Sequence, residues 1–303
     1  MSFTAKDVQA LREKTGCGMM DCKKALVECN GDMEAATDYL REKGLASQAK
    51  KASRIAAEGT VCAISENGVG VVVELNAETD FVAGGDEFKD LATKVAKVIL
   101  AQNPADMDAL LACVDNGQTV EEMVQELFLK VRENIKIRRF ERVEGKVVTY
   151  VHAGGKIGVM VNFDGDIDAN DDAFITMGKN VAMQIAAMSP SYLDEASVPA
   201  EVIEKEKEIL IAQMKEDPKM ANKPDAVLGK IVEGKIGKYY KENCLVEQQF
   251  VMDGDVTVGK YVANTAKELG KEIAIASFVR FEKGEGIEKR VDDFAAEVAS
   301  MVK

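Results

Sequence analysis

The 303-residue sequence contains one histidine, no tryptophan and only six cysteines, and these scarcities exclude several kinds of active site. With His152 alone, a metal site built from several histidines is excluded, and any serine or cysteine triad would have to use that residue. Six cysteines in a chain of this length are too few for a disulfide framework, and Cys17, Cys22 and Cys29 lack the spacing of a zinc knuckle. We therefore expect reduced thiols and no metal ligands.

The sequence also lacks the glycine motifs that bind phosphates and the serine motif of many hydrolases. No Gly-Lys pair is followed by serine or threonine, so a P-loop is absent. Neither a dinucleotide-binding fingerprint nor a Gly-x-Ser-x-Gly turn occurs. The sequence thus predicts no catalytic residue and no cofactor. An enzyme that uses His152 with nearby carboxylates is an alternative that no motif supports.

Basic residues are scarce relative to acidic ones, with 39 Lys and Arg against 52 Asp and Glu, and the net charge is −13. A phosphate backbone would repel such a chain, so we expect no direct nucleic-acid partner. No apolar run approaches the ~18 residues of a membrane span. The N-terminus also lacks the basic, apolar and small-residue order of a signal peptide. We expect a cytoplasmic protein that does not contact a membrane.

Residues 4–54 have the apolar spacing of three short helices. Thr4 and Asp7 have the spacing of a capping box, and the third helix is expected to end near Gly44. So few large apolar side chains can form only a marginal bundle. The sequence predicts a small recognition module, which the basic stretch 50–54 tethers to the rest of the chain.

A pattern of strands and a helix then occurs twice. Residues 59–75 are typical of a β-hairpin around an Asn-Gly dipeptide, and residues 88–100 have helical apolar spacing. The strand pattern recurs at residues 158–163, and all six apolar positions of the helix recur within residues 174–186. Two related α+β units packed together are the simplest interpretation. The alternative is a chance match of two apolar patterns.

Residues 199–240 are rich in Glu and Lys and are expected to form an arm of the kind that often serves as an assembly surface. Their narrow apolar stripe predicts a helical hairpin that projects from the body and packs mainly on itself. Strands are expected at residues 249–252 and 273–281, with a helix at residues 258–269 between them. A last helix is expected at residues 291–302.

The loop at residues 76–85 differs from its counterpart in the second unit, residues 164–170. Phe81 and Val82 lie there in polar, glycine-flanked sequence, whereas the second loop has no aromatic residue. One interpretation is that Phe81 folds back into the core. The other is that an aromatic residue beside an acid inserts into a protein partner, because aromatic anchors are enriched at binding hot spots.

Four motifs together resemble the bacterial translation elongation factor Ts family over essentially the whole chain. They are Thr79-Asp80-Phe81-Val82 and the segments at residues 11–26, 133–139 and 281–289. The resemblance implies a ubiquitin-associated-like N-terminal domain, a core of two related subdomains, an inserted coiled coil and a C-terminal helical module. The domains expected on this basis are 1–54 for the ubiquitin-associated-like domain, 55–142 for the core N-subdomain, 143–188 with 241–281 for the core C-subdomain, 189–240 for the inserted hairpin and 282–303 for the C-terminal module.

The resemblance also implies a function. Members of this family are guanine nucleotide exchange factors for elongation factor Tu, which they bind in its GDP-bound and nucleotide-free states. The residues that match Asp80 and Phe81 enter the nucleotide-binding domain of the partner and disturb Mg²⁺ coordination, so GDP leaves and GTP can replace it. Thr79 and Val82 complete this motif. Because the nucleotide and the metal belong to the partner, the resemblance implies no enzyme, cofactor or metal site in this chain.

Five further positions match partner-contacting or interface-proximal residues of the family, namely Met19, Met20, Lys23, Val131 and His152. The alternative for Met19 and Met20 is that they close the small bundle, with Lys23 merely solvated. Val131 fits plain helix packing equally well. An adaptor whose N-terminal bundle binds a ubiquitin-like protein is the alternative function. The sequence leaves open whether the chain forms a homodimer within a larger complex.

Overall fold

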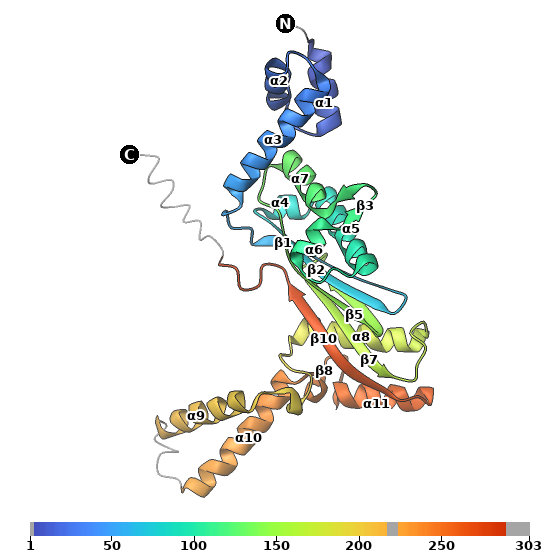
Figure 1. Cartoon of the computed structure of the whole chain (residues 1–303). Helices are drawn as coiled ribbons and strands as arrows, with labels where there is room; N and C mark the ends of the chain where they lie inside the picture. Colours follow the sequence, from blue (N-terminus) through green and yellow to red (C-terminus); the bar gives the residue numbers. More distant parts are fainter. Residues whose placement is uncertain (1–2, 217–223, 289–303) are drawn as a thin grey trace.

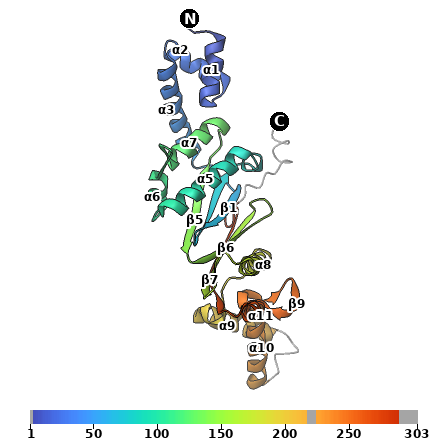
Figure 2. The ribbon, with the colours of Figure 1, turned by 90° about the vertical axis from the view of Figure 1, so that its right-hand side faces the viewer.

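The computed structural model describes residues 3–216 and 224–288 as an elongated molecule (Figure 1). Three helices lie at one end, two three-stranded sheets lie in the middle, and a pair of helices projects at the other end. A view turned by 90° keeps the same order along the long axis (Figure 2). Within the described ranges, no helix combines the length and the apolar character needed to cross a membrane.

The N-terminal module consists of α1 (Ala5–Thr15), α2 (Met19–Glu28) and α3 (Met33–Lys51). The predicted capping box is confirmed, because the Thr4 and Asp7 side chains accept from each other's backbone N–H. The predicted end of the third helix at Gly44 is wrong. A Cβ at Gly44 would overlap the side chain of Leu129, so α3 continues past a glycine that lets it lie against α7. Lys51 lies within this helix rather than in a free tether.

The first α+β unit is built around β2, which lies between β1 and β5 in an antiparallel sheet. Its elements are β1 (Glu58–Glu66), β2 (Val69–Ala77), α4 (Asp80–Ala83), α5 (Asp86–Gln102), α6 (Met107–Ala112), β3 (Val114–Asp115), β4 (Gln118–Thr119), α7 (Val120–Val131) and β5 (Lys136–Glu144). Asn67 and Gly68 both have positive φ, as the predicted two-residue hairpin turn requires. The sequence patterns did not indicate β5, α6 or the short β3–β4 hairpin.

The second unit repeats this order with β7 in the centre, between β6 and β10. Its elements are β6 (Lys146–His152), β7 (Ile157–Gly165), α8 (Asp172–Met188), a 3-10 turn (Glu195–Ser197), α9 (Ala200–Glu216), α10 (Asp225–Asn243), a 3-10 turn (Leu245–Glu247), β8 (Gln249–Phe250), β9 (Asp253–Thr257), α11 (Val258–Leu269) and β10 (Ile273–Glu282). Both units therefore run strand, strand, helix, strand. The repeated elements predicted from the apolar patterns are present.

The second half of the chain contains the predicted helical hairpin but a shorter strand than predicted. The helical hairpin is confirmed as α9 and α10, which share an apolar cluster of their own. The strand expected at residues 249–252 is only two residues long, because Phe250 pairs back onto Asp253 in a tight hairpin with β9. The last helix expected at residues 291–302 lies outside the described residues.

The two sheets pack against each other through the faces that their helices leave uncovered. On β2, Val71 and Val73 point toward the cluster that contains α5, whereas Val72 lies with Met160 in a small cluster between the units. The strand is buried on both faces for this reason. Gly158 lies in the same interface, where a Cβ would overlap the side chain of Val61. Glycine there allows the sheets to approach closely.

A fully buried carboxylate joins two strands of the first unit to the segment that follows β10. Glu74 of β2 is 0% exposed and faces the interface between the units. It accepts hydrogen bonds from Arg139 Nε (2.6 Å), Arg138 Nη1 (3.0 Å), the Gly284 N–H (2.7 Å) and Asn76 Nδ2 (3.1 Å). Burial alone would raise the pKa of Glu74, but these hydrogen bonds favour the ionised form and hold the pKa below its ordinary value. One carboxylate thus connects β2, β5 and the segment after β10.

Candidate partner-binding surface

The segment predicted as a loop between β2 and α5 contains the single helical turn α4. Thr79 is its N-cap residue, and its Oγ1 accepts a hydrogen bond from the Val82 N–H at 3.3 Å. Gly84 and Gly85 follow the turn, and Gly85 is the N-cap residue of α5. The chain therefore leaves the sheet, makes one turn and enters the next helix within a short, defined path.

Phe81 points away from the protein on this turn. Its side chain is 88% exposed, the largest value among the exposed large apolar residues of the described chain. The interpretation in which Phe81 folds back into the core is therefore wrong. Asp80 beside it is exposed as well. An exposed aromatic side chain adds little to the core, and aromatic residues in such positions are enriched at binding hot spots.

The other two side chains of α4 attach the turn to the first unit. Ala83 is buried in the main apolar cluster of that unit, and Val82 packs partly against the same cluster. The turn is thus amphipathic, with Val82 and Ala83 facing inward and Phe81 facing outward. Of the predicted motif, Asp80 and Phe81 are available to a partner, whereas Thr79 and Val82 hold the turn.

The start of α4 is held by a segment distant in sequence, which the sequence analysis did not assign a role. Glu133 accepts two hydrogen bonds from Thr79, one from its N–H to Oε2 (3.0 Å) and one from its hydroxyl to Oε1 (2.7 Å). Glu78 in turn accepts the Asn134 N–H at Oε1 (2.7 Å). The signal in the sequence was the family-like motif at residues 133–139, which contains both partners.

A second exposed apolar surface lies on α2. Met20 is 72% exposed, Met19 is 43% exposed, and Lys23 is exposed. The bundle is closed instead by other residues, so the interpretation in which Met19 and Met20 close it is wrong. The buried residues of α2 are Cys22, Ala25 and Leu26. Val27, which the sequence analysis did not single out, is also exposed and lies two turns after Met20 on the same side of the helix.

The surfaces on α2 and α4 are joined to consecutive residues of one segment. Arg132 at the end of α7 forms an ion pair with Asp21 of α2, with 2.9 Å between Nη2 and Oδ2. The next residue, Glu133, is the one that holds Thr79. The structure therefore connects the Met19 and Phe81 regions through the end of α7, although neither region follows the other in sequence.

Val131 and His152 take different positions from the residues above. Val131 is partly buried and packs against the first unit's apolar cluster, which agrees with the helix-packing alternative. His152 is exposed at the end of β6, where its Nδ1 lies 3.0 Å from the Tyr150 hydroxyl. No hydrogen bond or ion pair among the described residues links either of them to the turn that carries Phe81.

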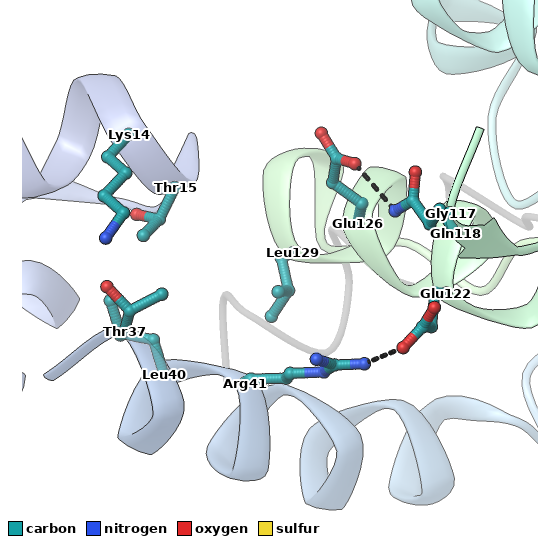
Figure 3. A pocket seen from close by; sticks show the side chains of 10 residues that line it. All are labelled: Lys14, Thr15, Thr37, Leu40, Arg41, Gly117, Gln118, Glu122, Glu126 and Leu129. Carbon is teal, nitrogen blue, oxygen red and sulfur yellow. Dashed lines mark hydrogen bonds and ion pairs between the residues drawn. The ribbon is translucent and has the colours of Figure 1, made fainter. Parts of the chain in front are cut away.

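A cleft of about 380 Å³ separates the N-terminal module from α7 (Figure 3). It is lined by Lys14, Thr15, Thr37, Leu40, Arg41, Gly117, Gln118, Glu122, Glu126 and Leu129. The Arg41 side chain crosses it to form an ion pair with Glu122. The Thr119 N–H, and then Arg41, hold the pKa of Glu122 below its ordinary value. One ion pair thus bridges the cleft between the N-terminal module and α7. Within the described part of the chain, no group of three or more His, Cys, Asp or Glu residues could hold a metal ion.

Comparison with known proteins identifies a family. The family model described as "Elongation factor TS" matches residues 78–285. The chain is 48% identical over 308 residues to Elongation factor Ts of Syntrophotalea carbinolica, with 100% of both chains covered. It is 49% identical over 305 residues to Elongation factor Ts of Clostridium perfringens, with 99% of both covered. Elongation factor Ts of Magnetococcus marinus is 46% identical over 308 residues, with 100% of both covered.

Proposed function

The chain belongs to the elongation factor Ts family, and we propose that it is a guanine nucleotide exchange factor that binds elongation factor Tu and promotes the release of GDP. The exposure of Phe81 supports this proposal most directly. Its aromatic side chain is 88% exposed on a turn that is held from both sides. Its exposure is a binding feature because the turn that carries it is otherwise packed against the core.

Exchange requires a difference in affinity rather than a chemical step. The factor binds the nucleotide-free form of the GTPase more tightly than the GDP-bound form, and linkage then requires it to weaken GDP binding by the same factor. No general base, nucleophile or cofactor in this chain takes part. Binding to both nucleotide states, with the stronger affinity for the empty one, lets the factor weaken GDP binding in the ternary complex, and returning nucleotide weakens the binding of the factor by the same amount.

Phe81 and Asp80 are the residues that act on the nucleotide site in this proposal. Phe81 enters the nucleotide-binding domain of the partner, where burial of its exposed ring favours the complex. The insertion displaces the groups that position the partner's Mg²⁺, and the Asp80 carboxylate enters beside it. Loss of the cation leaves the phosphate charges of GDP uncompensated, so the affinity for GDP falls.

The exposed residues of α2 supply additional contact area. Met19 and Met20 are flexible and polarisable, which suits an apolar contact that must form and dissociate in each cycle. Lys23 adds a charge on the same helix. His152 lies on an exposed strand end and is a further contact candidate, whereas Val131 packs against the apolar cluster of the first unit.

The two alternative functions are not favoured. An adaptor for a ubiquitin-like protein would need only the N-terminal module, yet the family model matches residues 78–285, which lie beyond that module. An enzyme would need His152 beside a carboxylate, whereas the His152 ring is hydrogen-bonded to the hydroxyl of Tyr150.

The test is a stopped-flow measurement of labelled GDP release from purified elongation factor Tu. The full-length chain is expected to accelerate release, and Phe81→Ala is expected to remove most of that acceleration. Val114→Ala, which truncates another exposed apolar residue of the first unit, is the matched control and should behave as the wild type. If the wild-type chain leaves the release rate unchanged, the proposed function is wrong.

A further inference from the structure

The segment between α7 and β5 is fixed on every side, although it is short and lies near the surface. Arg132 ends α7 in the left-handed conformation, with φ of 60°, so the chain turns sharply there. The next-but-one residue, Asn134, is 2% exposed, and its Nδ2 donates to the Arg54 carbonyl at 2.7 Å. Lys136 Nζ donates to the Ala52 carbonyl at 2.7 Å. The backbone on either side of Glu133 is therefore held in place.

Glu133 uses this fixed position to hold the neighbouring turn. Its two carboxylate oxygens accept from the N–H and the hydroxyl of Thr79, at 3.0 and 2.7 Å. The same Thr79 hydroxyl oxygen accepts the Val82 N–H at the start of α4. A carboxylate that accepts two hydrogen bonds from one residue restricts both the backbone and the side chain of that residue. Glu133 thus holds Thr79, the N-cap residue of the turn that carries Phe81.

We infer that Glu133 is a positioning residue for nucleotide exchange, which acts on the partner through the turn that carries Phe81. This inference rests on the proposed function and goes beyond it, because Glu133 need not touch the partner itself. Phe81 must enter the partner in one direction, and a misplaced anchor loses most of its effect. The hydrogen bonds to Thr79 supply that direction before the partner arrives, which avoids the cost of ordering the turn during binding.

The location of these hydrogen bonds separates positioning from simple stability. Both lie at exposed positions, where water can replace Glu133 as the acceptor for Thr79. Loss of Glu133 should therefore change the thermal midpoint little. The inward face of α4 remains packed through Val82 and Ala83, so the turn stays attached while its orientation becomes variable.

The experiment compares five full-length variants in the GDP-release assay at saturating factor. Glu133→Ala is expected to lower the maximal rate about tenfold. Glu133→Gln keeps one acceptor oxygen and an amide that can donate to the Thr79 hydroxyl, so it should recover part of the loss. In a Phe81→Ala background, Glu133→Ala should change the rate less than about twofold, because both changes act on one site. Glu141→Ala, which removes an exposed carboxylate from β5, is the matched control and should match the wild type.

A second readout does not depend on activity. Amide hydrogen exchange at Thr79 and Val82 should become faster in Glu133→Ala, while amides of β2 keep their protection. A wild-type maximal rate in Glu133→Ala would overturn the inference while leaving the proposed function intact. Fully additive losses in the double variant would also overturn it, because Glu133 would then act independently of Phe81. Failure of the wild-type chain to release GDP would instead refute the proposed function.

Discussion

The two α+β units have the same order of elements, yet they use the connection from the central strand to the helix in opposite ways. In the first unit, the connection carries Phe81, which is 88% exposed. In the second unit, Ile167 occupies the same place relative to the start of the helix and is only 8% exposed, within the apolar cluster of that unit. One connection displays its apolar residue, and the other buries it.

The difference shows what is needed to keep an apolar residue exposed on a defined surface. The second connection is held by its own buried Ile167 and by an Asx turn, in which Asp168 accepts the Asn170 N–H. The first connection cannot use Phe81 in this way. It is held instead by Glu133, which lies outside the repeated elements, and by Val82 on the inward face of α4. The chain between α5 and β5 supplies that external support.

The facing sides of the two central strands differ in the same manner. Glu74 of β2 is buried and fully engaged in hydrogen bonds, whereas Asn162, at the matching place in β7, has an Oδ1 with no hydrogen-bond partner among the described residues. Of these two matching strand positions, only the one in the first unit carries a charge. The stability of the interface should therefore depend unequally on the two strands.

The largest expected effect follows from this inequality. Glu74→Gln removes the charge that pairs with Arg138 and Arg139, and breaking a buried ion pair costs about 3–5 kcal/mol. Both arginines are partly exposed, so water compensates them in part and we expect a loss near the lower end. Asn162→Ala should cost no more than about 1 kcal/mol. Denaturant unfolding of both variants measures the difference, and equal losses would contradict the comparison.

The same carboxylate predicts how stability depends on pH. The folded-state pKa of Glu74 lies below the ordinary value of 4.5. Its contribution to the free energy of unfolding is therefore complete above pH 4.5 and is lost as the pH falls through the folded-state pKa. Between these limits the wild type should lose stability more steeply on acidification than Glu74→Gln. Parallel pH profiles of the two proteins would show that Glu74 is not the group responsible.

A pair of alanine substitutions tests the contrast between the two connections directly. Ile167→Ala should lower the free energy of unfolding by about 2–5 kcal/mol and leave GDP release by the folded protein unchanged. Phe81→Ala should change stability by less than about 0.5 kcal/mol and lower exchange about thirtyfold, which corresponds to ~2 kcal/mol at a binding hot spot. Prior removal of Mg²⁺ from the partner with EDTA should reduce the exchange deficit of Phe81→Ala. A low thermal midpoint in Phe81→Ala would show instead that Phe81 stabilises the fold as a core residue does.

The sequence predicts the repeated elements because their signals are local. Apolar spacing defines α5 and α8, and the Asn-Gly dipeptide defines the first hairpin. The direction of Phe81 is not a local property, because a loop of that composition can turn its aromatic residue either way. The outcome depends on Glu133, which lies 54 residues away along the chain. No spacing rule connects these two positions.

The burial of the Glu74 carboxylate likewise could not be predicted from the local sequence. The pattern of β2 predicts alternating faces, but it gives no reason for a glutamate within the apolar strand. That reason appears only when β5 and the segment after β10 are brought together, because Arg139 and the Gly284 N–H then both reach Glu74. Likewise, a Cβ at Gly44 would overlap the side chain of Leu129, a residue of another helix, so the reason for this glycine lies in a long-range contact. Long-range partners decide these features.

A smaller effect is expected from the surface on α2. Met20→Ala should weaken binding to elongation factor Tu about fivefold, or ~1 kcal/mol, because it truncates an accessory contact rather than the central anchor. The maximal rate of GDP release at saturating factor should remain close to that of the wild type. Titration of exchange rate against factor concentration separates the two quantities. A reduced maximal rate with unchanged affinity would place Met20 with Phe81 instead of with the accessory contacts.

The smallest effect concerns the ion pair that joins α2 to the end of α7. Arg132 and Asp21 are both partly exposed, and such pairs contribute about 0.2–1 kcal/mol. Asp21→Asn should therefore leave the melting temperature nearly unchanged. The loss should appear as a shift of about twofold in the factor concentration for half-maximal exchange, because the α2 surface is then less firmly oriented toward the partner. The shift should decrease at high salt, where screening already weakens the pair in the wild type. An effect of Asp21→Asn that grows with salt would show that Asp21 acts other than through Arg132.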